Sequence, residues 1–285
     1  MSSDTGLSRS RYATQLRAYA TEVADVTSAI DRCDRWAGTF VDRMGQAFDG
    51  RITLEVGCFD AEFLCHVAAK HPTRAFIGLD WKCKPLLDGA MRIRSAGLAN
   101  VLLLRGRAQD VRQYFGVGEL NDAWLFHPDP CDRPVELKNR LFSEAWLLDL
   151  HTTLRDDAST LTLKTDHPGY YQWALALLGL PMPAWFEPAR QAHHSGGRLE
   201  GVPRIRAKDV VSADQLPPAS RAACRAFEIT MNSADFWEDA AALRQMLHEP
   251  FAGEATLFEQ RFRAKRQPIY AMQLRRLSTK LLNDP

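Results

Sequence analysis

Residues 52–57, Ile-Thr-Leu-Glu-Val-Gly, and residues 75–80, Ala-Phe-Ile-Gly-Leu-Asp, are the two stretches that decide the fold. Each is a short apolar run that ends in a glycine or an aspartate, and a segment of helical length separates them. Similar runs follow at Val101–Leu104, Ala123–Phe126 and Leu161–Leu163. Strand-length runs that alternate with helix-length spacers predict an α/β fold with a mostly parallel, Rossmann-like sheet covered by helices on both faces.

The segment before the first strand is predicted to be helical. Between Arg11 and Phe48, apolar residues recur at three- and four-residue steps among charged residues, which is typical of amphipathic helices. We therefore assign residues 1–50 to an N-terminal helical segment and residues 51–180 to the Rossmann-like core.

The regular alternation stops near Leu180, where prolines become frequent. We assign residues 181–250 to an insertion or lid, which contains a flexible loop around Gly196-Gly197. After it, Thr256–Phe262 and Ile269–Leu274 alternate in hydrophobicity and predict two antiparallel strands. Residues 251–285 are thus expected to supply the strands that close the core.

The composition excludes several classes of protein. Lys and Arg total 36 against 35 for Asp and Glu, so nucleic-acid binding requires a local basic patch. The six cysteines form no C-x-x-C pair, which predicts neither a zinc site nor a disulfide framework. No stretch reaches about 18 apolar residues, and residues 1–11 lack the apolar core of a signal peptide. A cytoplasmic protein without a membrane span is expected.

The ends of the first two strands suggest a ligand site. Gly57 allows a ligand to approach the backbone closely, and Asp80 can accept hydrogen bonds from both hydroxyls of a ribose. Phe59 and Ala61 stand where a dinucleotide fingerprint requires small residues, which disfavours NAD. The alternative is purely structural, because buried strands often end in Gly or Asp through turn chemistry.

An ordered set of short motifs resembles the bacterial tRNA (guanine-N7)-methyltransferases. The similarity covers Ile52–Leu178 and resumes over residues 256–274, roughly half of the chain. Its pieces are Leu54-Glu55-Val56-Gly57, Phe76-Ile77-Gly78-Leu79-Asp80, Pro128-Asp129-Pro130, Lys138-Asn139-Arg140-Leu141, Lys164-Thr165-Asp166, and Thr256 with Glu259.

The resemblance implies a class I S-adenosylmethionine-dependent methyltransferase without a metal. It assigns cofactor binding to Glu55, Gly57, Asp80, Arg107 and Ala108. It assigns catalysis to Asp129 and Asp166, and substrate binding to Lys138, Arg140, Thr256 and Glu259.

The chemistry of guanine N7 explains why two aspartates are expected. N7 carries a lone pair in the ring plane and needs no deprotonation, so the protein mainly has to place the base. Carboxylates can do so by accepting hydrogen bonds from N1–H and the exocyclic amine. Asp129 and Asp166 follow the fourth and fifth predicted strands, at the edge where ligands collect. The alternatives are a turn for Asp129, a helix cap for Asp166 and solvated charges for Lys138 and Arg140.

Departures from the family pattern leave three functions open. Phe59, Ala61 and Arg107 replace residues usual at the cofactor, and residues 131–135 lack the basic stretch that follows Pro-Asp-Pro in the family. The partner is therefore tRNA or a small heterocyclic substrate. A third possibility is a fold relative without methyl transfer that acts as a binding protein. The sequence leaves the oligomeric state open.

Overall fold

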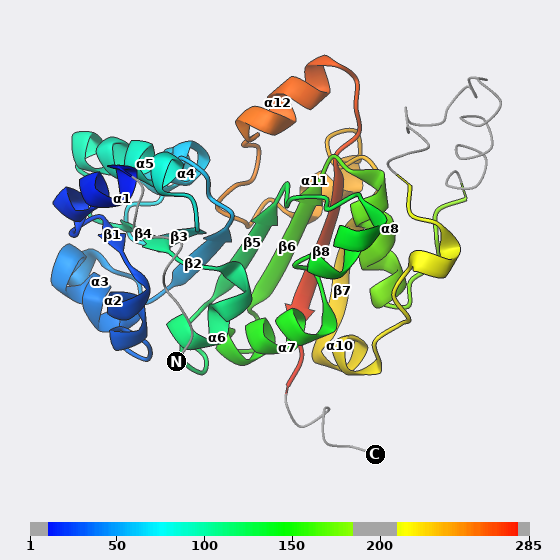
Figure 1. Ribbon diagram of the computed structural model, residues 1–285, viewed down its shortest axis with the longest axis horizontal. Helices are drawn as coiled ribbons and strands as arrows, with labels where there is room; N and C mark the ends of the chain where they lie inside the picture. Colours follow the sequence, from blue (N-terminus) through cyan, green and yellow to red (C-terminus); the bar gives the residue numbers. More distant parts are fainter. Residues whose placement is uncertain (1–10, 185–209, 279–285) are drawn as a thin grey trace. The chain divides into compact units, whose positions relative to one another are not determined.

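A computed structural model describes residues 11–184 and 210–278 (Figure 1). The chain divides into two compact units. Unit 1 holds the residues up to Trp124 together with Thr152–Arg155, and unit 2 holds Leu125–His151 and the residues from Asp156 onward. The predicted loop around Gly196-Gly197 lies outside the described residues.

Unit 1 contains the parallel part of the sheet. Its strands follow the order β1-β4-β3-β2-β5, and β5 passes from unit 1 into unit 2 at Trp124. The pairs β1–β4, β3–β4 and β2–β3 are parallel. Every residue of β2 is buried, as expected for a strand covered on both faces. The bounds are β1 Val23–Ala24, β2 Ile52–Val56, β3 Ala75–Asp80, β4 Val101–Arg105 and β5 Asp122–Phe126.

Helices cover both faces of these strands. Helices α4 and α5 lie on one face, and α2 and α3 lie on the other (Figure 1). The helices are α1 Arg11–Leu16, α2 Val26–Asp31, α3 Trp36–Met44, α4 Glu62–Lys70, α5 Cys83–Ala96 and α6 Val111–Tyr114, with 3₁₀ turns η1 Arg17–Tyr19, η2 Gly45–Ala47 and η3 Ala108–Asp110.

Unit 2 contains the antiparallel part. Its strands follow the order β5-β6-β8-β7, and β8 runs antiparallel to both β6 and β7. Helix α8 packs against β6 and β8. The bounds are β6 Thr160–Thr165, β7 Phe227–Ser233 and β8 Tyr270–Arg276, with helices η4 Pro134–Asn139, α7 Glu144–Thr153, α8 Pro168–Leu177, η6 Ala213–Gln215, α10 Arg221–Ala226, α11 Ala240–Gln245 and α12 Leu257–Ala264.

The predicted α/β fold class is confirmed, and all five core strands and the strand at Ile269–Leu274 are present. The strand predicted at Thr256–Phe262 is wrong, because these residues form α12 and its N-cap. Thr256 and Glu259 make a capping box, a local signal that outweighs the apparent two-residue alternation.

Two strands of the structure, β7 and β1, were not predicted from the sequence. Strand β7 lies within the range 181–250, and its bulge between Ile229 and Met231 interrupts the alternation that reveals a strand. Strand β1 is only two residues long, so it leaves no periodic pattern within the helical segment. Among the described residues, no helix combines the length and apolar character needed to span a membrane.

Candidate functional site

The ends of β2 and β3 bring Gly57 and Asp80 together within unit 1. The strands pair in register at Val56 and Leu79, and the Gly57 N–H donates to the Leu79 carbonyl at 2.7 Å. The Asp80 carboxylate accepts the N–H of Phe59 at 3.2 Å. The two positions are therefore neighbours at the carboxyl edge of the parallel strands, as predicted from their spacing.

The loop after β2 has a backbone conformation that favours glycine at three positions. The φ angles are 80° at Gly57, 52° at Phe59 and 53° at Ala61. A left-handed conformation costs a non-glycine residue about 1–2 kcal/mol, and such outliers persist where the surroundings enforce them. The chain thus keeps a glycine-type loop although two of the glycines usual in the family are replaced by Phe59 and Ala61.

The space directly beside Gly57 is open. A Cβ placed on Gly57 would meet no atom of the described chain within 4 Å. Phe59 is 48% exposed, so its ring is not part of the packed core. Burial raises the pKa of Asp80, although hydrogen bonds from the backbone of Lys82 and Phe59 act in the opposite direction.

The other predicted cofactor residues lie on the same strands or just after them. Glu55 is buried on β2 opposite Gly78 of β3. Arg107 follows β4 with an exposed side chain, and Ala108 begins η3. Gly106 joins this edge to β3, because its N–H donates to the Asp80 carbonyl at 3.0 Å.

In unit 2, the ends of β5 and β6 bring together His127 and Asp166. His127 Nδ1 lies 3.2 Å from Asp166 Oδ1, and the His127 N–H donates to the Lys164 carbonyl at 2.7 Å. The cap of α8 is His167, whose ring accepts the Tyr170 N–H. The alternative interpretation of Asp166 as the helix cap is therefore wrong.

Asp129 lies in the loop after β5 and is exposed. Its Oδ1 accepts the N–H of Cys131 at 3.1 Å, which is the turn-forming hydrogen bond expected of an Asp between two prolines. This bond uses one acceptor site of the carboxylate and leaves others for a ligand.

A fully buried ion pair joins β6 to α12. Lys164 Nζ lies 3.0 Å from Glu259 Oε1, and both side chains are 0% exposed. The ammonium lies 4.6–5.2 Å from the ring centroids of Phe126, Phe236, Trp237 and Phe251. Such contacts stabilise a desolvated cation.

Glu259 also fixes the start of α12. Its Oε2 accepts the Thr256 N–H at 2.7 Å, and the Thr256 hydroxyl accepts the Glu259 N–H at 3.1 Å. Burial raises the pKa of Glu259, but the charges of Lys164 and His127 and the bond from Thr256 oppose it, and the pKa is lowered overall. The structure therefore places Thr256 and Glu259 in the interior as a cap and an ion-pair partner.

Arg140 connects the loop that carries Asp129 to the first turn of α8. Its Nε donates to the Pro130 carbonyl at 2.8 Å, and Nη1 donates to the Gly169 carbonyl at 2.7 Å. The side chain is buried against Tyr170 and Trp173, and burial lowers its pKa. Lys138 of η4 is instead exposed.

The sequence pattern does not indicate that His127 is a neighbour of Asp166. A single histidine between a buried strand and a proline carries no specific signal. Its φ of 49° is visible only in the structure. Lys164 was recognised within Lys-Thr-Asp, but its burial among aromatic rings depends on residues far along the chain.

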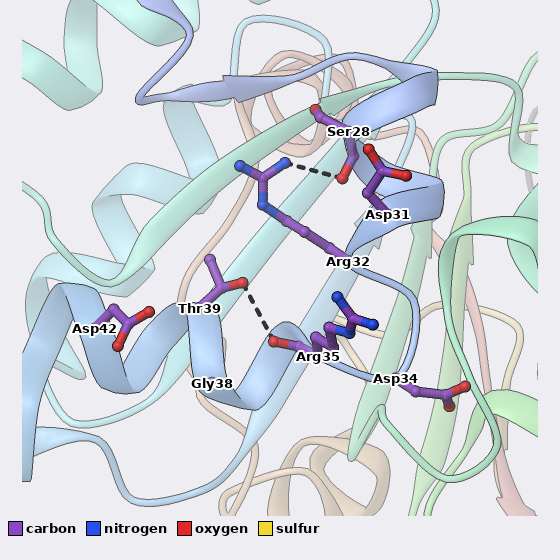
Figure 2. Close-up of a pocket in the computed structure, with 8 residues that line it drawn as sticks. All are labelled: Ser28, Asp31, Arg32, Asp34, Arg35, Gly38, Thr39 and Asp42. Carbon is purple, nitrogen blue, oxygen red and sulfur yellow. Dashed lines mark hydrogen bonds between the residues drawn. The ribbon is translucent and has the colours of Figure 1, made fainter.

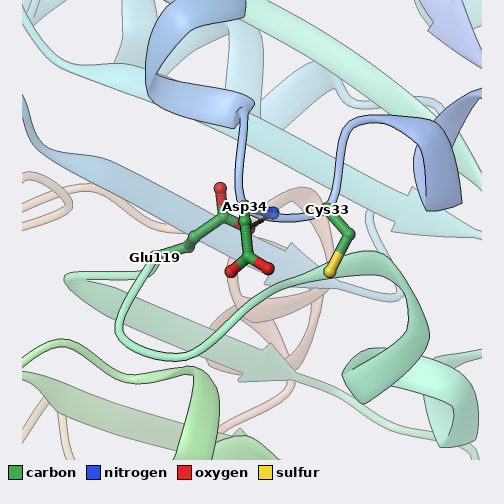
Figure 3. A group of neighbouring side chains, drawn as sticks. All are labelled: Cys33, Asp34 and Glu119. Atoms are coloured by element: carbon green, nitrogen blue, oxygen red, sulfur yellow. Dashed lines mark hydrogen bonds between the residues drawn. The ribbon is translucent and has the colours of Figure 1, made fainter.

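Two other features lie among the N-terminal helices of unit 1. A hollow of about 690 Å³ is lined by residues of α2, α3 and the turn between them. Figure 2 shows these residues, with Arg32 donating to the Ser28 carbonyl. Cys33, Asp34 and Glu119, shown in Figure 3, also lie close together. Their potential ligand atoms are within 4.8 Å of one another.

The Glu119 carboxylate of that cluster already accepts three backbone N–H groups. They come from Asp34 at 2.9 Å, Trp36 at 3.0 Å and Gly116 at 2.7 Å. The cluster is explained by these bonds, which join the turn before α3 to the loop after α6.

The strand order, with antiparallel β8 between β6 and β7, is that of the class I S-adenosylmethionine-dependent methyltransferases. Residues 49–182 match the sequence profile of the family described as "Putative methyltransferase". The predicted resemblance to tRNA (guanine-N7)-methyltransferases is confirmed over about half of the chain.

Two curated relatives carry the name tRNA (guanine-N(7)-)-methyltransferase. The Bdellovibrio bacteriovorus protein is 32% identical over 124 residues, which cover 44% of this chain and 59% of the relative. The Thermus thermophilus protein is 32% identical over 145 residues, which cover 50% of this chain and 46% of the relative. The chain thus spans about half the length of these relatives.

A solved structure, the 16S rRNA methyltransferase KamB, is also similar to the chain. It aligns with a TM-score of 0.47 and 14% identity over 83% of this chain and 92% of that chain.

Proposed function

We propose that the protein is an S-adenosylmethionine-dependent N-methyltransferase that transfers a methyl group to a ring nitrogen of a guanine-like heterocycle. The observation that carries this proposal is the loop after β2, which keeps left-handed φ angles at Gly57, Phe59 and Ala61 beside Asp80. A loop that served only to connect β2 with α4 would gain nothing from the two unfavourable conformations at Phe59 and Ala61.

The residues of unit 1 fit the adenosyl part of the cofactor. Gly57 leaves open space at the backbone, and the Asp80 carboxylate can accept hydrogen bonds from ribose hydroxyls. Glu55, Arg107 and Ala108 complete this side of the site. When bound, S-adenosylmethionine supplies an electrophilic methyl group on a positively charged sulfur.

The residues of unit 2 hold the acceptor base in this proposal. Asp166 is 32% exposed and keeps Oδ2 available, since His127 Nδ1 contacts Oδ1. Asp166 and Asp129 accept hydrogen bonds from the N1–H and the amine of the base, so that the nitrogen lone pair is presented in one orientation. Orientation of this kind can contribute about 7–11 kcal/mol to lowering a barrier.

We favour a nucleic acid over a small molecule as the carrier of the heterocycle. Helix α12 and the turn after it expose Arg261, Lys265 and Arg266, and none of the three forms an ion pair within residues 11–184 and 210–278. Unpaired surface cations suit phosphate contacts, as does exposed Lys138. The relatives named above act on tRNA, which makes tRNA guanine the first substrate to test.

The second candidate is a small heterocyclic substrate. It is favoured by residues 131–135, Cys-Asp-Arg-Pro-Val, which carry one acidic and one basic side chain. Nucleoside mass spectrometry of tRNA from a deletion strain separates the two, because unchanged 7-methylguanosine points to the small substrate.

The cofactor and the acceptor side are tested separately. Calorimetric titration with S-adenosylmethionine should give saturable binding, and its absence at high micromolar cofactor would favour the non-catalytic binding protein. In Asp166→Ala, methyl transfer should fall steeply while the affinity for the cofactor changes little. Equal loss of both quantities would argue against a substrate role for Asp166.

A further inference from the structure

An aromatic side chain of α12 remains partly exposed beside the strand-end carboxylate of unit 2. Phe258 is 44% exposed, and its ring centroid lies 6.1 Å from that of His127 and 6.5 Å from that of Phe262. The His127 and Phe262 centroids are 6.0 Å apart. The three rings form one cluster, and its member His127 contacts Asp166.

The position of Phe258 is fixed by its neighbours in the sequence. Thr256 and Glu259, on either side of Phe258, close the capping box, and Glu259 is held by the buried ammonium of Lys164. The first turn of α12 is therefore anchored to β6 by this ion pair, and Figure 1 shows α12 beyond the end of β6. An anchored aromatic ring loses little further entropy when it contacts a ligand.

The geometry points to a stacking platform, formed by Phe258 against His127, for the flat ring that Asp166 orients. This inference rests on the proposed function and adds a residue that determines specificity. A carboxylate accepts N–H groups at the edge of a heterocycle, whereas an exposed ring packs against its face. Only a planar heteroaromatic ring uses both, so the platform favours purine-like substrates over aliphatic amines.

The histidine ring supports this assignment independently of Phe258. His127 Nε2 is buried and makes no hydrogen bond to any residue that the structure describes. A buried ring nitrogen without a partner is costly in an ordinary core. Its position beside a partly exposed ring and a carboxylate is consistent with a site that a polar ligand completes.

The platform is tested by the binding of guanosine 5′-monophosphate to the full chain. Stacking on an aromatic side chain contributes about 1–3 kcal/mol per base, so Phe258→Ala should weaken binding by about 5- to 150-fold. Phe258→Leu should also weaken binding, although it keeps an apolar contact with His127. Phe258→Trp should preserve or strengthen it. Circular dichroism establishes that each variant is folded.

Leu257→Ala is the matched control, because Leu257 is 43% exposed on the same helical turn. We expect its binding constant to match that of the unmodified protein. Equal losses in Leu257→Ala and Phe258→Ala would overturn the platform, as would unchanged binding in Phe258→Leu.

Asp166→Ala separates this inference from the proposed function. If Asp166→Ala loses binding and Phe258→Ala does not, the platform is wrong and the guanine site stands. If the unmodified protein shows no saturable binding of the nucleotide, both are overturned. If Asp166→Ala and Phe258→Ala both lose nucleotide binding and Leu257→Ala keeps it, the platform and the proposed function are both supported.

Discussion

Replacing Lys164 by methionine should destabilise the protein strongly, although the new side chain is apolar and enters a cage of aromatic rings. The change leaves the Glu259 carboxylate in an interior where its side chain is 0% exposed. Removing one partner of a buried ion pair typically costs about 3–5 kcal/mol. Glu259 keeps hydrogen bonds from Thr256 N at 2.7 Å and Trp237 Nε1 at 3.3 Å, so we expect the lower end of that range, about 3 kcal/mol.

Urea denaturation measures this loss as a change in the free energy of unfolding. Lys84→Met is the control, because the Lys84–Asp88 pair at 2.6 Å lies on the surface with side chains 58% and 44% exposed. An exposed pair of this kind should give no measurable change. A loss below about 1 kcal/mol in Lys164→Met, or equal losses in both variants, would refute the reasoning.

Three further predictions concern packing, capping and pH. A Cβ at Gly78 would lie 2.7 Å from Cys58 Sγ, so Gly78→Ala should lower the free energy of unfolding by about 1–3 kcal/mol in urea denaturation. Gly38→Ala in α3 is the control, because its Cβ would meet nothing within 4 Å and the variant should not be destabilised. Thr256→Ala should lower the free energy of unfolding by about 1 kcal/mol, because the N-cap of α12 is lost. Thr256→Ser should keep most of that stability, and equal losses in the two variants would exclude capping as the cause. Because the pKa of Glu259 is lowered from 4.5, its contribution is present above that pH and is lost as the pH falls through the folded-state pKa. In Lys164→Met, urea unfolding curves recorded at decreasing pH should no longer show this loss of unfolding free energy.

The core of the fold was predictable because its signals are local. Continuous apolar runs such as Ile52–Val56 and Val101–Leu104 are long enough to indicate buried strands, and their spacing indicates parallel pairing. The same logic placed Gly57 beside Asp80. It failed at residues 256–262, where a capping box fixes a helix, and at β7, where a bulge shifts the alternation between Ile229 and Met231.

The site was less predictable because its contacts join distant parts of the chain. Lys164 and Glu259 are adjacent in space only because α12 packs over β6, and neither residue alone signals a buried pair. The resemblance implies substrate binding for Arg140, yet its guanidinium donates to two backbone carbonyls and packs against two aromatic rings in the interior. Nothing in the local sequence distinguishes it from exposed Lys138, two residues earlier.

The place of β8 has a consequence for biosynthesis. The strand at Tyr270–Arg276 follows the other strands that the structure describes, yet it lies between β6 and β7 and is hydrogen-bonded to both. Until the ribosome has released these residues, the edges of β6 and β7 that β8 later occupies lack their hydrogen-bonding partner and can pair with another chain. Translation that stalls before residue 270 should therefore yield an aggregation-prone intermediate that depends on chaperones.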